Sequence, residues 1–367
     1  MLRHIFHQLR HFDWLLLGSV LLLLTLGLAA LYSIATGADS PDYLNFKKQI
    51  IFACIGLAVM LIASFFDYRV WENYSYFFYA ICVVLLIGVL FFGRTIRGTT
   101  GWYSVAGFNF QPVELAKIGL LAILAWFLSR RPQAVHDLRT FLLSGATMAL
   151  LFVLVVLQPD FGSAIMLFAM WLVLVVLSGA QWKHLAVVAG LVLIALAFSW
   201  VFLFQDYQKD RINSFFDPQA DPYGRGYHVR QAVTAVGAGG LLGRGLGFGS
   251  QSQLKFIPAS ETDFIFAVIA EELGFLGVSL MLSLWGLIFF RLYRAAQRVR
   301  DGFGMLFILG VSALFLAHIT VNIGMNIGLL PVTGISLPFV SYGGSFLVVS
   351  LVLVGMVEGI IVRNAPN

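Results

Sequence analysis

The chain has 367 residues, of which 60% are hydrophobic and only 11% are charged, and its formal net charge is +5. A soluble domain carries about 25% charged residues, so this composition excludes an ordinary water-soluble enzyme. It indicates a protein whose main solvent is lipid.

Ten stretches of about 20 apolar residues predict ten transmembrane helices, and we treat residues 1–367 as one all-α membrane domain. In chain order the stretches cover residues 14–34, 49–66, 73–93, 112–129, 140–157, 162–179, 185–204, 264–290, 305–330 and 342–362. The first is too long for the apolar part of a cleaved signal peptide, so we expect it to be part of the mature fold.

An even number of spans places both termini on the same side of the membrane. If that side is the cytoplasm, the short cytoplasmic segments hold twelve Lys and Arg residues and the short external segments hold four. The positive-inside bias therefore predicts cytoplasmic termini, and the long loop of residues 205–262 is then external.

This long loop is both basic and rich in glycine. Its basic residues are Lys209, Arg211, Arg225, Arg230, Arg244 and Lys255, and it contains the stretch GAGGLLGRGLGFGS. One interpretation is a solvated surface loop. The other is an anion site, because phosphate oxygens need Arg and Lys donors, and a glycine-rich backbone can approach a ligand or bend through positive φ. The stretch lacks the strand–glycine–helix context of a nucleotide fingerprint, which excludes a Rossmann or P-loop site.

Three ionisable residues fall near the outer ends of predicted spans. Glu114 and Lys117 lie three residues apart, hence on one helix face, and Asp160 interrupts the hairpin QPDFGS. Such groups are costly at this depth unless they pair or line a wet cavity, so we expect Lys117 to pair with Asp160 or with Glu114. A structural ion pair and the border of a functional cavity both remain open.

Asp263 stands where the basic loop meets the eighth span, with Thr262 on its loop side. It could be a helix N-cap, which stabilises a helix by about 1 kcal/mol. A carboxylate beside a partly dry cavity that faces phosphate-binding cations also has what a general base requires. Glu271 and Glu272 lie deeper in the span, and we expect them to be structural.

The last external loop is predicted to face the same cavity as the long loop. The run NIGMNIGLLPVTGISLPFVSYGGS holds two prolines and several glycines, and broken backbone is tolerated at membrane depth only where it is buried in protein or lines a cavity. His318, within the ninth span, is interpreted as a hydrogen-bonded contact between helices, and no metal-ligand spacing accompanies it.

Five blocks of the sequence resemble the SEDS family, named for shape, elongation, division and sporulation. They are FNFQPVELAKIG, QPDFGSA, RINSFFDP with GYHVRQA, SQSQLKFIPASETDFIFAVIAEELGF and the NIGMNIG run, and the likeness extends from about Trp14 to Val362. GSQSQLKFIP and GMNIGLLPVTG are more similar to rod-shape members than to division members. Val113 and Phe346 depart from the pattern, because serine is common at both positions.

The resemblance implies a peptidoglycan glycosyltransferase of the bacterial inner membrane. It would polymerise lipid II, a disaccharide-pentapeptide on undecaprenyl pyrophosphate, at the outer face. Asp263 matches the family's catalytic aspartate, and inversion at the donor sugar needs one base and stabilisation of the leaving pyrophosphate. The expected substrate-binding residues are Arg211, Arg225, Arg230, Gln231, Arg244, Thr262, Glu114, Lys117, Asp160 and Ser341.

The implied partners are lipid II, a class B penicillin-binding protein that crosslinks peptides, and the elongation machinery, with no nucleic acid. The sequence leaves open whether a divalent cation assists the departure of the pyrophosphate. Two other functions also stay open. A lipid transporter or flippase would use the membrane charges to line its path, although the sequence has no clear internal repeat to support it. A non-catalytic scaffold for a cell-wall synthase would tolerate replacement of these charges.

Overall fold

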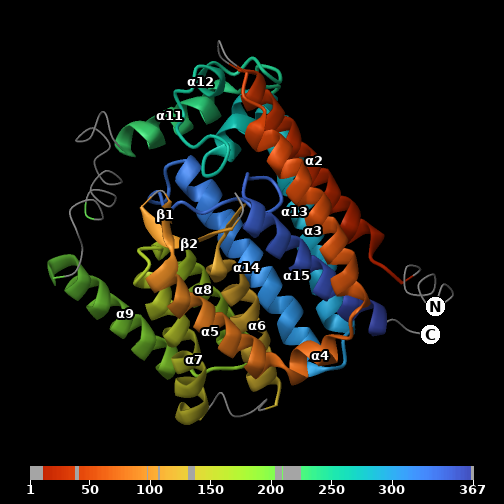
Figure 1. The fold of residues 1–367 in the computed structure, drawn as a ribbon, viewed down its shortest axis with the longest axis vertical. Helices are drawn as coiled ribbons and strands as arrows, with labels where there is room; N and C mark the ends of the chain where they lie inside the picture. The colour runs from red at the N-terminus through yellow and green to blue at the C-terminus, as the bar shows by residue number, and fades with distance from the viewer. Residues whose placement is uncertain are drawn as a thin grey trace.

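The computed structural model describes residues 11–37, 41–96, 98–105, 108–130, 137–202, 209 and 225–364. Within these ranges nine helices are long and apolar enough to cross a membrane, and α8 is apolar but shorter. Together they account for the ten predicted spans (Figure 1). They are α2 (Trp14–Thr36), α3 (Leu44–Phe65), α5 (Ser75–Phe92), α6 (Pro112–Ser129), α7 (Leu138–Val156), α8 (Phe161–Leu177), α9 (Trp182–Phe202), α13 (Ile265–Arg298), α14 (Gly302–Asn326) and α15 (Gly344–Arg363). A short helix, α4 (Tyr68–Asn73), follows α3.

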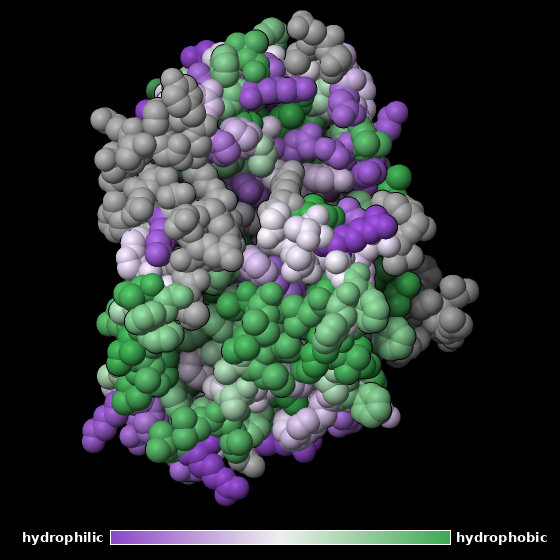
Figure 2. Space-filling model, turned by 60° about the vertical axis from the view of Figure 1, so that its left-hand side comes forward, coloured by the Kyte–Doolittle hydropathy of each residue, from purple (hydrophilic) through white to green (hydrophobic). Residues whose placement is uncertain are grey.

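The core of the bundle is formed by α6, α14 and α15. In the most apolar 18-residue stretch of these helices, 78%, 61% and 67% of the residues are buried. In α5 and α9 the corresponding shares are 22% and 0%, so these helices lie at the periphery. Figure 2 shows the exposed apolar side chains as a green belt, with hydrophilic residues gathered beyond it at both ends. Such a belt is the surface that a multi-pass protein presents to the hydrocarbon core of a bilayer.

A small antiparallel sheet between α5 and α6 was not predicted, and it corrects the all-α assignment locally. Its strands β1 (Arg94–Ile96), β2 (Thr99–Val105) and β3 (Phe108–Phe110) lie in the order β1-β2-β3. The run TTGWYSV is rich in β-branched and aromatic residues and lies between glycines. This pattern is typical of a short strand, but it is obscured by the long apolar runs on either side.

The long loop is partly helical. It contains α11 (Arg225–Ala238) and α12 (Ser250–Gln253), and the glycine segment, residues 239–249, connects them. This segment packs against α13 where that helix is broken at Gly274, whose φ is 64° and ψ is −162°. Phe275 N donates to Gly240 O at 2.9 Å, and Leu276 N donates to Leu241 O at 3.1 Å.

In the opposite direction, Arg244 N donates to Glu271 O at 3.0 Å and Gly245 N donates to Glu272 O at 2.9 Å. A Cβ at Gly243 would collide with the backbone of Glu272. Close backbone contact with α13 therefore explains Gly239 and Gly243, and the segment satisfies polar groups of the broken helix. The positive φ predicted for this segment is present at Gly240, Gly243, Gly245 and Gly247. Packing against α13 and positive φ thus account for these glycines, and an anion site in the loop stays a prediction.

Glu271 and Glu272 help to hold the loop on α13, in agreement with the structural role expected for them. Glu271 accepts hydrogen bonds from Gln251 N at 2.8 Å and Ser252 N at 3.0 Å. Glu272 accepts one from Ser33 Oγ at 2.6 Å, which connects α13 to α2. The first half of α13, which follows Asp263 in the chain, is therefore fixed to both the long loop and α2.

Candidate functional site

A cavity of about 550 Å³ lies at the end of the bundle that carries α11 and the sheet. Its walls include five residues predicted for the site, which are Glu114, Lys117, Asp160, Thr262 and Asp263. The segment between α14 and α15 lines it with residues 332–336, 342 and 343, and the start of α15 with residues 344–346. The long loop contributes His228 and residues 258, 259 and 262, followed by residues 263 and 264 before α13. The prediction that both loops face one cavity is thus confirmed.

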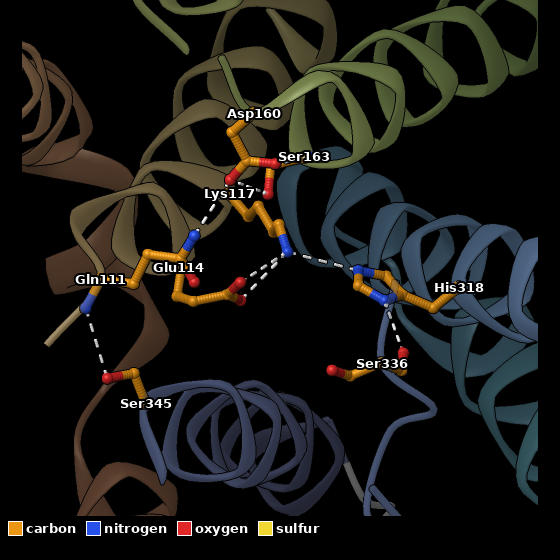
Figure 3. A network of polar contacts seen from close by, with 8 residues as sticks. All are labelled: Gln111, Glu114, Lys117, Asp160, Ser163, His318, Ser336 and Ser345. Carbon is orange, nitrogen blue, oxygen red and sulfur yellow. Dashed lines mark hydrogen bonds and ion pairs between the residues drawn. The ribbon is translucent and has the colours of Figure 1, made fainter. Parts of the chain in front are cut away.

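Lys117 and Glu114 form a buried ion pair on α6. Lys117 Nζ lies 2.9 Å from Glu114 Oε1 and 3.0 Å from Oε2, and the two residues are 1% and 5% exposed. Figure 3 shows the lysine reaching between this carboxylate and His318 of α14. Of the two pairings expected for Lys117, the structure contains the one with Glu114, one helical turn away.

The expected pairing of Lys117 with Asp160 is wrong, because Asp160 has other partners. It is the N-cap of α8, where its Oδ1 accepts from Ser163 N at 3.0 Å and its Oδ2 accepts from Ser163 Oγ at 2.8 Å. Gln111 Nε2 donates to Oδ2 as well, at 3.0 Å (Figure 3). These donors stabilise the charged carboxylate locally, and Asp160 still lines the cavity.

Asp263 lies in the turn before α13. The N-cap of α13 is Phe264, which makes no side-chain capping hydrogen bond, so the interpretation of Asp263 as the N-cap residue is wrong. Two side chains of α14 hold the backbone instead, since Asn322 Nδ2 and Asn326 Nδ2 donate to Asp263 O at 3.0 and 2.9 Å. Asp263 is placed on the cavity wall by amides from consecutive turns of a central helix.

These two asparagines support the cavity wall, and they were not predicted from the sequence. Both are fully buried. The signal was present, because two amides four residues apart in an apolar span share one helix face and need hydrogen-bond partners. Their partners, the carbonyl of Asp263 and that of Ile335, could not be identified without the tertiary structure.

Ser341 supports the cavity wall from behind. It is 1% exposed, its Oγ donates to Thr262 O at 2.6 Å, and the same oxygen accepts from Leu337 N at 2.8 Å. Because its hydroxyl is engaged within the protein and Ser341 does not line the cavity, the structure favours a supporting role over direct contact with substrate. Thr262 itself does line the cavity.

The cations of the long loop are distributed differently from the prediction. Arg211 lies outside the described residues, and Arg225 begins α11. Arg230, Gln231 and Arg244 do not line the cavity, and Arg244 is exposed and donates to Ser250 Oγ at 2.9 Å. Two lysines, Lys48 and Lys117, do line it, and Lys48 was not proposed from the sequence.

No three His, Cys, Asp or Glu side chains within the described ranges gather closely enough to hold a metal ion. A smaller cavity of about 260 Å³ lies near both ends of the chain and is lined by Asp13 and Arg291, which pair at 2.7 Å. It contains none of the predicted site residues, so the 550 Å³ cavity is the candidate active site.

Proteins of known family match this chain over nearly its whole length. The FtsW/RodA/SpoVE family model, described as cell cycle protein, matches residues 13–365. The chain is 37% identical to the peptidoglycan glycosyltransferase MrdB of Escherichia coli (strain K12) over 355 residues, which are 95% of this chain and 93% of that protein. It is also 37% identical to stage V sporulation protein E of Bacillus subtilis (strain 168), covering 94% of this chain and 95% of that one.

Solved structures share the fold. A chain from a structure described as "Structural coordination of polymerization and crosslinking by a peptidoglycan synthase complex" matches with a TM-score of 0.83 at 31% identity, covering 97% of this chain and 99% of that one. The rod shape determining protein RodA of Thermus thermophilus matches with a TM-score of 0.74 at 30% identity, covering 97% and 98%.

Proposed function

Because this chain belongs to the SEDS family, it is a multi-pass peptidoglycan glycosyltransferase of the inner membrane, and we propose that it polymerises lipid II with Asp263 as general base. The observation that carries the proposal is the position of Asp263, on the wall of a cavity that also holds the Glu114–Lys117 pair. A carboxylate and an ammonium in one sheltered cavity are the two groups that an inverting transfer needs.

In the proposed reaction, an acceptor hydroxyl attacks the anomeric carbon of the donor sugar as its proton passes to Asp263. The bond from that carbon to the pyrophosphate oxygen breaks, and the lipid pyrophosphate leaves with the electron pair. Asn322 and Asn326 hold the backbone of Asp263, so little reorganisation is needed for the base to meet the hydroxyl.

The leaving pyrophosphate needs cations in the same cavity. We assign this role to Lys117 and Lys48, because both line the cavity, and no longer to Arg244, which does not. Contacts of Arg211 and Arg225 with the donor remain part of the proposal. Arg230 and Gln231, like Arg244, do not line the cavity, so we do not assign them to the pyrophosphate. A divalent cation, if bound in the cavity, would supply further positive charge to the leaving group.

A crosslinking partner is supported by the likeness to a chain from a peptidoglycan synthase complex that coordinates polymerization and crosslinking. We propose that the partner is a class B penicillin-binding protein and that the pair acts within the elongation machinery. Glycan strands need a transpeptidase to crosslink their peptides, and this partner would supply it.

The experiment that tests the function measures glycan chains made from lipid II by the purified full-length chain, with and without its transpeptidase. Asp263→Asn keeps the shape of the side chain and removes its basicity, so we expect polymerisation to fall by about 10²- to 10⁴-fold. Asp301→Asn is the matched control, because Asp301 caps α14 far from the cavity and asparagine caps equally well.

Near wild-type polymerisation by Asp263→Asn would refute the assignment of the base. A wild-type chain that moves lipid II across vesicles without making glycan would indicate the transporter. A chain that makes no glycan, moves no lipid and yet stimulates its transpeptidase would indicate the scaffold.

A further inference from the structure

His318, on α14, contacts Lys117 of α6. Its Nε2 lies 3.3 Å from Lys117 Nζ, and its Nδ1 lies 3.1 Å from Ser336 O, in the segment between α14 and α15 (Figure 3). The imidazole is 2% exposed and lines the cavity. The proposed mechanism assigns no task to this group.

The two neighbours of the imidazole define its protonation state. An ammonium can only donate hydrogens, so Nε2 must accept, and a carbonyl can only accept, so Nδ1 must carry a hydrogen. The neutral imidazole with its hydrogen on Nδ1 meets both requirements. The other neutral tautomer fails at both contacts, and an imidazolium would place two cations 3.3 Å apart.

The orientation of the ring is also determined by its surroundings. Phe346, in the first turn of α15, stacks on the imidazole with ring centroids 4.8 Å apart and an interplanar angle of 25°. The same phenyl ring lies 5.4 Å from Lys117 Nζ. Contacts from α6, from α15 and from the segment before it therefore hold His318 in place.

A neutral acceptor suits a cation that must act on a substrate. Glu114 lies one turn away on the same helix and holds the ammonium from that side only. The lone pair of His318 Nε2, on α14, attracts the Lys117 ammonium from a second direction and does not neutralise its positive charge. A second carboxylate in that place would hold the lysine more tightly and neutralise the charge that the pyrophosphate needs.

We propose that His318, as the neutral tautomer with its hydrogen on Nδ1, is a positioning residue that aims the Lys117 ammonium at the donor pyrophosphate. This inference rests on the proposed function for the role of Lys117, and on the geometry alone for the tautomer. The two parts can be tested separately.

The first test compares His318→Gln with His318→Leu in the full chain bound to its transpeptidase. Glutamine can offer Oε1 near the position of Nε2, whereas leucine has similar bulk and no acceptor. We expect leucine to lower kcat by about 10- to 100-fold with a smaller change in KM for lipid II, and glutamine to stay within several-fold of wild type. Equal losses in both variants, or no loss in either, would overturn the positioning role.

The second test observes the tautomer directly, by NMR of the full chain in nanodiscs with ¹⁵N-labelled histidine. The chain has seven histidines, and the signal absent from His318→Gln identifies the one of interest. We expect a neutral ring protonated on Nδ1, and Lys117→Met should shift its Nε2 resonance. A ring protonated on Nε2, or an imidazolium at neutral pH, would overturn the inference. If Asp263→Asn stays active, the assignment of the general base is wrong, but the NMR result still tests the tautomer of His318 separately.

Discussion

Lys117→Met tests whether the buried ion pair stabilises the bundle. Lys117 and Glu114 are 1% and 5% exposed, and both carboxylate oxygens lie within 3.0 Å of the ammonium. Removing one partner of a buried pair costs about 3–5 kcal/mol, because the remaining charge is buried without compensation. Protonation of Glu114 limits the loss, so we expect a decrease in unfolding free energy at or below the lower end of that range.

The double variant Glu114→Gln/Lys117→Met isolates the contribution of the uncompensated charge. It removes both charges and nearly preserves volume, and replacing a whole buried pair is often close to neutral. We therefore expect the double variant to be more stable than Lys117→Met alone. Arg130→Met is the matched control, since Arg130 pairs with Glu72 at 3.6 Å on the surface and its side chain is 55% exposed. That pair contributes about 0–1 kcal/mol.

The assay is thermal denaturation of each purified variant in one detergent and lipid mixture, followed by size-exclusion chromatography of the surviving fraction. The result that would refute the reasoning is a double variant as unstable as Lys117→Met. The loss would then arise from packing of the lysine stem, and not from the charge left on Glu114.

Two further predictions concern the long loop and its side of the membrane. Gly243→Ala should destabilise the protein by about 1–3 kcal/mol, because φ is +78° there and a Cβ would collide with the backbone of α13. Gly237→Ala is the control, since a Cβ at Gly237 meets open space, and it should leave the melting temperature unchanged in the same assay. Equal melting temperatures for the two would contradict the packing argument. In a chain without its native cysteines, Ser250→Cys should react with an impermeant thiol reagent in intact cells and Gln297→Cys only after rupture, because the basic end of α13 is predicted to be cytoplasmic. The reverse pattern would overturn the orientation.

The ten spans could be predicted from the sequence, because each apolar run of about 20 residues is long enough to cross a bilayer. Few structures other than a membrane-spanning helix would remove so long an apolar run from water. Two features escaped that argument. The small sheet lies between Arg94 and Phe110, and its strands of three, seven and three residues are too short to stand out beside the helices. The break in α13 at Gly274 lies within a single predicted span, and only its contact with the glycine segment explains it.

The site residues were identified from the sequence for a similar reason. Charges such as Glu114, Lys117 and Asp160 are costly in apolar surroundings, so their presence within apolar runs is enough to indicate a cavity or a partner. Sequence alone did not determine how they are paired. Asp160 is occupied by donors from Ser163 and Gln111, which leaves Lys117 to Glu114.

Tertiary structure also decided which residues hold the backbone of Asp263 and which cations line the same cavity. Asn322 and Asn326 reach Asp263 across 59 and 63 residues of sequence. Arg244 lies in the glycine segment that binds the backbone of α13, and it does not line the cavity. Periodicity and hydrophobicity report the local preference of a segment for helix and lipid. Hydrogen bonds between distant segments depend on how all the helices pack together, so they cannot be inferred from the sequence of any one segment.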